Sequence, residues 1–368
     1  MEKIKVFTLF SGYDSQCLAL DRLHDKTGFD YELVGWSEID KFAIKAHNAI
    51  YPEHENKNYG DVAKIDWNNV PDFDLLTYSS PCQDVSKAGL QRGAKKDSET
   101  RSSLIWCIEN AIMTKKPKYL LLENVANFVS KKHIDTFNKW QLTVSKIGYK
   151  NFCQILNARN YGIPQNRDRI FLVSVRNDLN RIFYFPQPIK LTKKWFDLME
   201  SEVSDKYFIS DKRLQRMIER NMLAPENFNF KFKPKTQNDI VANAITTRSG
   251  SRETDNFVLL GLTRKKEKAT FHDVDIVNTI TTRQRNNATN YIKQLSGKIR
   301  TLTERECFRL MGIDDSTINK IQAAQISRTQ QIKLAGNSIV VDVLYHIFFK
   351  MFVDTKPNVY EQIEFNFK

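Results

Sequence analysis

One cysteine, Cys82, lies where the sequence predicts an accessible and reactive side chain. The apolar run Leu75–Tyr78 predicts a short buried strand, and the small polar residues and Pro81 that follow require a sharp turn. Cys82 therefore comes just after the carboxyl end of a strand, the edge at which open α/β sheets bind ligands. A thiolate there is nucleophilic if a helix N-terminus or nearby basic side chains lower its pKa. Taken alone, a free cysteine is more often an inert apolar residue.

An acid and two arginines follow or precede other predicted strands. The buried strand predicted for Tyr119–Leu122 ends at Glu123, which shares a rim with Cys82 if the two strands run parallel. Arg167 and Arg169 stand at the entrance of a later strand, and their spacing predicts that they point to the same face. They could hold a base oxygen and a neighbouring carboxylate or phosphate. The ordinary alternatives are a helix cap or ion pair for the acid and solubility for the arginines.

Three blocks of residues resemble the motifs of the DNA (cytosine-5)-methyltransferase family, in its order and at about its spacing. They are Pro81-Cys82-Gln83, Glu123-Asn124-Val125 and Gln165–Arg169. The resemblance extends from Phe10 to Val340, with a poorly matching stretch between about 186 and 297. It implies an α/β fold, a Rossmann-like sheet of the S-adenosylmethionine-dependent methyltransferases, with a second, smaller and mostly β target-recognition domain.

The resemblance also implies a sequence-specific enzyme that methylates carbon 5 of cytosine. Cys82 would add to ring carbon 6, which turns carbon 5 into a nucleophile toward the methyl group of S-adenosylmethionine. Glu123 would protonate ring nitrogen 3, Arg169 would hold the exocyclic oxygen, and Arg167 would position the neighbouring groups or backbone. The target base must be extruded from the duplex, because the ring carbon cannot be reached inside the stack.

The N-terminal third carries the pattern of a nucleotide-binding unit. A strand predicted for Ile4–Phe10 leads through a glycine turn into a helix, and the next strand, Tyr31–Trp36, ends at Glu38, a suitable acid for ribose hydroxyls. A solvated loop carboxylate is the alternative for such an acid. By resemblance, the cofactor-binding residues are Phe10, Ser11, Gly12, Asp14, Ser15, Glu38, Ile39, Asp61, Val62, Pro81, Leu104, Asn337 and Ser338.

Two of these positions depart from the family's pattern. Asp14 and Ser15 stand where the family has glycines, which permit close backbone approach to a ligand. Aspartate and serine can instead cap the helix that follows. A helix is further expected over Ser103–Met113, after a polar segment from Lys87 to Arg101.

The chain is long enough for two domains. We expect residues 1–185 with 330–368 to form the catalytic and cofactor-binding domain, and residues 186–329 the target-recognition domain and hinge. Arg300–Glu306 contains the start of a helix, with a cap followed by acids. Leu334–Ser338 is expected to open a long apolar helix through Phe349 that returns to the first domain.

The recognition region contains an internal repeat. Asn243–Arg248 recurs as Asn278–Arg283, and each copy is followed by the start of an aromatic strand. Exposed threonine and arginine in two such units could line a DNA groove, where Arg248 and Arg283 would read bases. Two ordinary hairpins of one sheet are the alternative. By resemblance, Gln83 and Ser86 would also contact the substrate.

Composition supports a polyanionic partner. The 56 lysines and arginines exceed the 43 acids and give a net charge of +13, which suits double-stranded DNA, although an AT-rich genome would also enrich lysine. Five scattered cysteines without CxxC spacing indicate a reduced protein without a metal site. No stretch approaches the roughly 20 apolar residues of a membrane span. We expect a monomer in the cytoplasm of a bacterial or phage-infected cell, associated with the nucleoid; a cognate restriction endonuclease is left open.

Three other functions compete with this interpretation. A tRNA cytosine methyltransferase would keep the chemistry, but a second domain of about 110 residues favours DNA. A DNA-binding protein without activity would explain the missing glycines, but the three intact blocks argue against it. A nicotinamide-dependent Rossmann enzyme is disfavoured because the first turn has one glycine.

Overall fold

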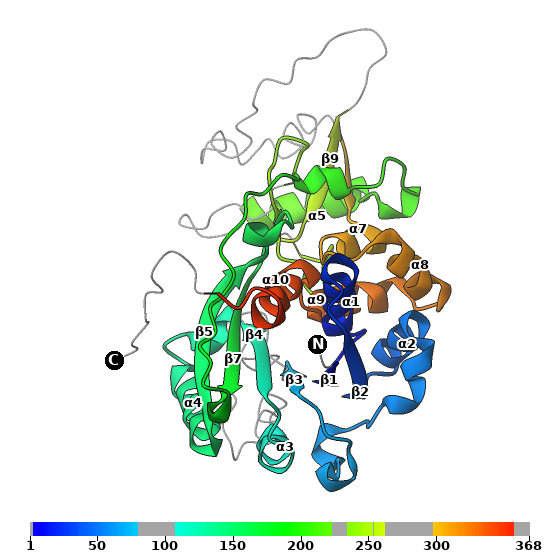
Figure 1. The fold of residues 1–368 in the computed structure, drawn as a ribbon. Helices are drawn as coiled ribbons and strands as arrows, with labels where there is room; N and C mark the ends of the chain where they lie inside the picture. The colour runs from blue at the N-terminus through cyan, green and yellow to red at the C-terminus, as the bar shows by residue number, and fades with distance from the viewer. Residues whose placement is uncertain (1–2, 80–106, 223–233, 253, 262–296, 357–368) are drawn as a thin grey trace.

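The computed structural model describes residues 3–79, 107–222, 234–252, 254–261 and 297–356. Six strands form the central sheet, in the order β2-β1-β3-β4-β7-β5 (Figure 1). Strands β1 to β4 run parallel, and β7 is antiparallel to both of its neighbours. The strands are β1 (Ile4–Leu9), β2 (Tyr31–Ser37), β3 (Leu75–Tyr78), β4 (Tyr119–Val125), β5 (Tyr149–Asn157) and β7 (Asp168–Arg176). The predicted α/β sheet is confirmed.

Both faces of the sheet are covered, because the parallel strands are mostly apolar and successive side chains point to opposite faces. Val6 packs in one core cluster and the adjacent Phe7 in the other; Leu75 and Leu76 divide in the same way. Helices α1 (Ser15–Thr27), α2 (Lys41–Ile50) and α10 (Val341–Phe352) contribute to the first cluster, and α3 (Ile108–Lys115) and α4 (Ile134–Ile147) to the second.

The strand order creates one switch point in the parallel part of the sheet. After β1 the chain moves to β2 on one side, and it then crosses back to β3 on the other side of β1. In open α/β sheets, ligands bind outside the carboxyl ends of the strands that flank such a point. The segments that leave these two ends are the Phe10–Asp14 turn and the stretch that contains Cys82.

A smaller region follows β7 and lies beyond one end of the sheet (Figure 1). Its described strands are β8 (Ala242–Asn243), which pairs with β6 (Gln165–Asn166) from just before β7, and β9 (Phe257–Gly261), which pairs with β10 (Gly297–Thr301). The prediction of a mostly β region missed helix α5 (Asp211–Met222), although Leu214 and Met217 have helical spacing and are buried.

Three helices connect this region to the sheet: α7 (Glu304–Arg309), α8 (Asp315–Ala323) and α9 (Arg328–Asn337). The predicted start of α7 is confirmed, because Thr303 and Glu306 form a capping box. The proposed division of the chain into two domains stays a prediction. Short 3-10 helices occur at Pro52–Lys57, Val62–Lys64, Trp67–Asn69, Ala126–Val129, Ala158–Tyr161, Asn177–Leu179, Trp195–Leu198 and Asp205–Tyr207.

The expected helix from Leu334 through Phe349 is wrong in one respect, because the chain forms two helices there. Helix α9 ends at Asn337 and α10 begins at Val341, so the Leu334–Ser338 segment closes a helix rather than opening one. The carbonyl oxygens of Gly336 and Ser338 accept hydrogen bonds from Arg167 instead of continuing the helical ladder. Helix α10 packs beside α1, as expected for a C-terminal segment that returns to the sheet.

The segment Arg328–Phe352 is long and apolar enough to cross a membrane by length and composition, contrary to the expectation from sequence. It comprises α9, the link and α10, and 56% of its most apolar window is buried inside the protein. Core helices of globular proteins pass the same test, so this segment is explained by its place in the core.

Candidate active site

The turn after β1 has an unusual backbone. Phe10, Gly12 and Asp14 have positive φ angles of 54°, 60° and 68°. A Cβ atom built on Gly12 would have no heavy atom of the described residues within 4 Å. Positive φ is costly for residues with side chains, and a turn that keeps it at alternate positions is held in place by its surroundings.

Asp14 supplies much of that support from inside the protein. Its carboxylate accepts hydrogen bonds from Cys17 N–H at 3.1 Å and from the Thr8 hydroxyl at 2.9 Å, and lies 3.6 Å from Nε2 of His47. The expectation that Asp14 caps the following helix is confirmed. The side chains of Asp14 and Ser15 are both buried, so only their backbone faces the turn.

The acid at the end of β2 is tied to the same turn. Glu38 accepts a hydrogen bond from the N–H of Gly12 at 3.0 Å and two more from its own following backbone at 2.8 Å. Next to it, Ile39 is 70% exposed, an unusual degree for a large apolar side chain. The oxygen of Asn58 accepts from the N–H of Glu38 and of Gly60, and so joins the end of β2 to the segment before Asp61.

Asp61 begins the short 3-10 helix Val62–Lys64 and caps it by accepting from Ala63 N–H at 3.1 Å. Its side chain remains 38% exposed, whereas Val62 is buried. Hydrogen bonds thus link the first turn, the end of β2 and the segment before Asp61.

Glu123 and Arg169 meet at the carboxyl end of β4. Because β7 runs antiparallel beside β4, the start of β7 lies next to the end of β4. Nε of Arg169 is 3.0 Å from Oε1 of Glu123, and only 7% of the Glu123 residue is exposed. A guanidinium and a carboxyl group are therefore paired at the predicted rim, and β3 and β4 do run parallel, as the shared rim with Cys82 requires.

Arg167 has different partners from Arg169, and the expectation that the two point to one face stays a prediction. Arg167 lies before β7 begins, and its buried guanidinium donates to the carbonyl oxygens of Ile245 at 2.8 Å, Gly336 at 3.0 Å and Ser338 at 2.8 Å. The alternation of a strand applies only within the strand, which starts at Asp168.

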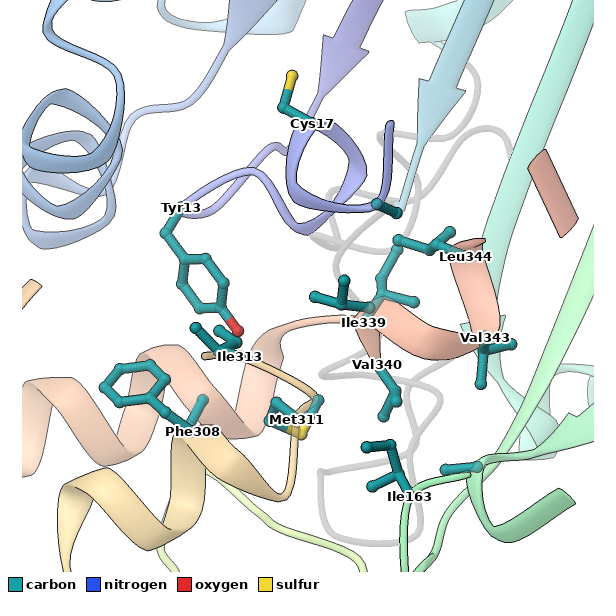
Figure 2. Close-up of a cluster of buried hydrophobic side chains, with 14 of the residues drawn as sticks. Tyr13, Cys17, Ile163, Phe308, Met311, Ile313, Ile339, Val340, Val343 and Leu344 are labelled. Atoms are coloured by element: carbon teal, nitrogen blue, oxygen red, sulfur yellow. The ribbon is translucent and has the colours of Figure 1, made fainter. Parts of the chain in front are cut away.

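Tyr13 links the first turn to the C-terminal helices, a role that the sequence did not reveal. Its hydroxyl donates to Ser338 Oγ at 2.5 Å, and Ser338 in turn donates to the carbonyl of Ala335 at 2.9 Å. Burial raises the pKa of Tyr13 to about 12, so the hydroxyl keeps its proton at neutral pH. Figure 2 shows the ring of Tyr13 reaching toward Phe308, with a ring-centroid distance of 5.8 Å, and toward the link between α9 and α10.

Several predicted residues lie outside the described part of the chain. They are Pro81, Cys82, Gln83, Ser86, Leu104 and Arg283. A helix was expected over Ser103–Met113; in the described residues, α3 begins at Ile108. Of the two repeat copies, Asn243–Arg248 is described: it leaves β8 and enters a turn in which Thr247 and Arg248 are exposed, and β9 starts at Phe257 as predicted.

Solved structures share this fold at low sequence identity. The methyltransferase EhMeth of Entamoeba histolytica aligns with a TM-score of 0.72 at 16% identity, over 97% of this chain and 100% of its own. The Dnmt2 methyltransferase of S. pombe gives a TM-score of 0.65 at 18% identity, over 94% of this chain and 97% of its own. At such identities the likeness establishes the Rossmann-like methyltransferase fold alone.

Sequence relatives extend over nearly the whole chain. The type II methyltransferase M2.ScrFI of Lactococcus lactis subsp. cremoris is 34% identical over 408 aligned positions, which cover 95% of this chain and 99% of the relative. The orphan methyltransferase M.SPRI of Bacillus phage SPR is 29% identical, over 95% of this chain and 97% of its own. The family profile described as C-5 cytosine-specific DNA methylase matches residues 4–352. The chain therefore belongs to that family and is a DNA (cytosine-5)-methyltransferase.

Proposed function

We propose that this enzyme methylates an extruded cytosine of double-stranded DNA with S-adenosylmethionine as donor, through a transient bond between Cys82 and ring carbon 6. The observation that carries the proposal is the Glu123–Arg169 pair, with 3.0 Å between Nε and Oε1. The pair sits at the carboxyl end of β4, beside the parallel strand β3 from which the chain runs on to Cys82.

Enzymes of this family use S-adenosylmethionine, and the residues around the switch point fit it. Gly12 has a positive φ, and a Cβ atom built on it would meet no heavy atom of the described residues within 4 Å, so a ligand can approach the backbone closely. Glu38 and Asp61 offer carboxylate oxygens to ribose hydroxyls and to the adenine amino group, and the exposed Ile39 offers an apolar surface to the base. When bound, S-adenosylmethionine supplies a methyl group that a sulfonium centre makes electrophilic.

The remaining proposed contacts come from the turn and from four other parts of the chain. Phe10, Ser11, Asp14 and Ser15 would contribute through the turn itself, and mainly by backbone where their side chains are buried. The others would be Val62, Pro81, Leu104, Asn337 and Ser338, of which Ser338 is already joined to the turn through Tyr13.

The chemistry of the protein's own groups follows from their positions. The Cys82 thiolate forms a bond to ring carbon 6, and the displaced electron pair makes carbon 5 nucleophilic. Glu123 gives a proton to ring nitrogen 3 as negative charge builds there, and Arg169, which orients the Glu123 carboxyl, also holds the exocyclic oxygen. After methylation, a base removes the proton from carbon 5, the double bond reforms, and the thiolate leaves carbon 6, while ring nitrogen 3 returns its proton to Glu123.

Binding and extrusion of the base fall to the basic surface and the second region. Extrusion costs a few kcal/mol, which phosphate contacts of a chain with a net charge of +13 can offset. We propose Gln83 and Ser86 as contacts to the target nucleotide and Arg248 and Arg283 as contacts to neighbouring bases. Residues 186–329 would form the target-recognition domain and hinge, and residues 1–185 with 330–368 the catalytic domain.

We also propose the oligomeric state of the enzyme and its place in the cell. It acts as a monomer. It works on nucleoid DNA in the cytoplasm of bacterial or phage-infected cells, since relatives come from both sources. A cognate restriction endonuclease would accompany it if it belongs to a type II pair, as its Lactococcus relative's name indicates for that protein.

Transfer of a labelled methyl group to DNA tests the proposal. Wild-type protein should label duplex DNA, and Cys82→Ala should label none while its DNA affinity persists. Cys153→Ala is the matched control, because Cys153 is a partly exposed cysteine on the edge strand β5, away from β3 and β4. Labelling by Cys82→Ala at the wild-type rate would reject the nucleophile.

A further inference from the structure

The loop Thr246–Arg252, which carries Arg248, is attached at its base to the entrance of β7. The buried side chain of Gln165 accepts a hydrogen bond from Ile245 N–H at 2.9 Å and donates to the Leu310 carbonyl at 2.5 Å. Arg167, two residues later, donates to the carbonyl of the same Ile245 at 2.8 Å. The N–H and the carbonyl group of Ile245, which precedes the loop, are therefore both bound by side chains that lie just before β7.

A third contact comes from Gly336 in the last turn of α9. A Cβ atom at this position would lie 2.4 Å from the carbonyl carbon of Thr246 and 2.4 Å from the nitrogen of Thr247. Gly336 is helical and has no positive φ, so its backbone conformation does not require glycine. Glycine inside a helix costs about 1 kcal/mol relative to alanine. Position 336 requires glycine because the backbone of the loop approaches it so closely.

We propose that Gln165, Arg167 and Gly336 form a seat that positions the Thr246–Arg252 loop, and that this seat determines which DNA sequence is methylated. The inference rests on the proposed role of this loop in target recognition. Discrimination by base contacts depends on hydrogen-bond geometry and is worth about 1–3 kcal/mol for each bidentate pair. A loop displaced by a few tenths of an ångström loses part of that discrimination even when every base-contacting side chain is intact.

Gly336→Ala is a direct test of the seat. To bring the 2.4 Å approach to the 3.0 Å minimum of real Cβ contacts, one of the two backbones must move by about 0.6 Å. Helix α9 is anchored by the buried Leu334 and Ala335, whereas Thr247 is exposed, so the loop should move. Alanine also favours the helix, which separates the effect on the loop from damage to α9.

Gln165→Met is the second variant, because methionine has a similar length but neither accepts from Ile245 nor donates to Leu310. Thr329→Ala is the matched control, an exposed position on the same helix. The target site is first defined by bisulfite sequencing of plasmid DNA methylated by the wild-type protein. The ratio of kcat/KM for the target duplex to that for duplexes with one base pair changed beside the cytosine is then measured.

Both seat variants should lower this selectivity ratio about tenfold, mainly by loss of rate on the target. Their affinity for S-adenosylmethionine should stay within about twofold of wild type, and Thr329→Ala should match the wild type throughout. If Gly336→Ala does not fold, the Gln165→Met ratio decides. An unchanged ratio, or an equal loss on all duplexes together with weaker cofactor binding, overturns the seat. Absence of methylation by the wild-type protein would instead reject the proposed function.

Discussion

Arg167 and Arg169 are two residues apart, but their contacts predict different effects of the same substitution. A lysine should lower mainly the stability at position 167 and mainly the activity at position 169. The guanidinium of Arg167 is buried and binds Ile245 through one end and Gly336 and Ser338 through the other. A lysine ammonium is a compact charge that cannot span both ends of this fork. Arg167→Lys therefore leaves one or two buried carbonyl groups without a donor, at about 1–3 kcal/mol each.

We expect Arg167→Lys to lower the free energy of unfolding by about 2–4 kcal/mol. Arg169→Lys should cost less than about 1 kcal/mol, because lysine keeps the positive charge beside Glu123 and the Arg169 side chain is 19% exposed. Methyl transfer by Arg169→Lys should nevertheless fall at least about tenfold, since a lysine cannot hold the carboxyl and a base oxygen together.

Equilibrium urea unfolding followed by tryptophan fluorescence and circular dichroism measures the first effect, and single-turnover methyl transfer measures the second. Arg159→Lys serves as control, because Arg159 is exposed in the 3-10 helix Ala158–Tyr161 before these residues; its stability should stay within about 0.5 kcal/mol of wild type. A wild-type stability for Arg167→Lys, or a larger loss for Arg169→Lys than for Arg167→Lys, would refute the assignment of the two arginines.

Three further changes should have separate effects. Glu123→Gln removes the proposed acid and should slow single-turnover transfer about a hundredfold or more with DNA affinity retained in a gel-shift assay; a near-normal rate would exclude the acid role. Glu38→Gln should raise the calorimetric Kd for S-adenosylmethionine about tenfold, because the charged carboxylate binds hydroxyls more strongly than an amide, and an unchanged Kd would remove Glu38 from the pocket. Burial raises the pKa of Asp40, but hydrogen bonds from Lys333 and its own helix outweigh burial and hold this pKa below its usual value. The ion pair between Lys333 and Asp40 therefore stabilises the fold at pH values above the unfolded pKa of aspartate, near 4. The stability difference between wild type and Lys333→Met should be constant from about pH 6 to 8 and shrink as pH falls below about 4. A difference that grows on acidification would contradict this role of the ion pair.

Much of the sheet could be predicted from sequence, because buried parallel strands are short apolar runs with polar residues near their ends. Leu75–Tyr78 has the same bounds as predicted, whereas β4 continues two residues past Glu123 to Val125. The function was predicted from the three residue blocks that resemble the family's motifs. Membership of the family decides against the three competing functions. The cap formed by Asp14 was also predictable, since aspartate before a helix has a strong local preference.

Contacts between distant segments could not be read from local patterns. The break between α9 and α10 depends on Arg167, which lies about 170 residues earlier in the chain and binds the carbonyls that a continuous helix would use. The bond from Tyr13 to Ser338 spans 325 residues and has no sequence signal. The need for glycine at position 336 appears only once the Thr246 backbone lies against it.

The bond between Cys82 and the target cytosine is tested most directly with a duplex in which fluorine replaces hydrogen at carbon 5. After methyl transfer, a proton can leave carbon 5 but a fluorine cation cannot, so the thiolate stays attached to carbon 6. Wild-type protein with S-adenosylmethionine should give a protein–DNA adduct that survives denaturing electrophoresis, and Cys82→Ala should give none. Release of all DNA on denaturation, from protein that methylates the unmodified site, would contradict covalent catalysis by Cys82.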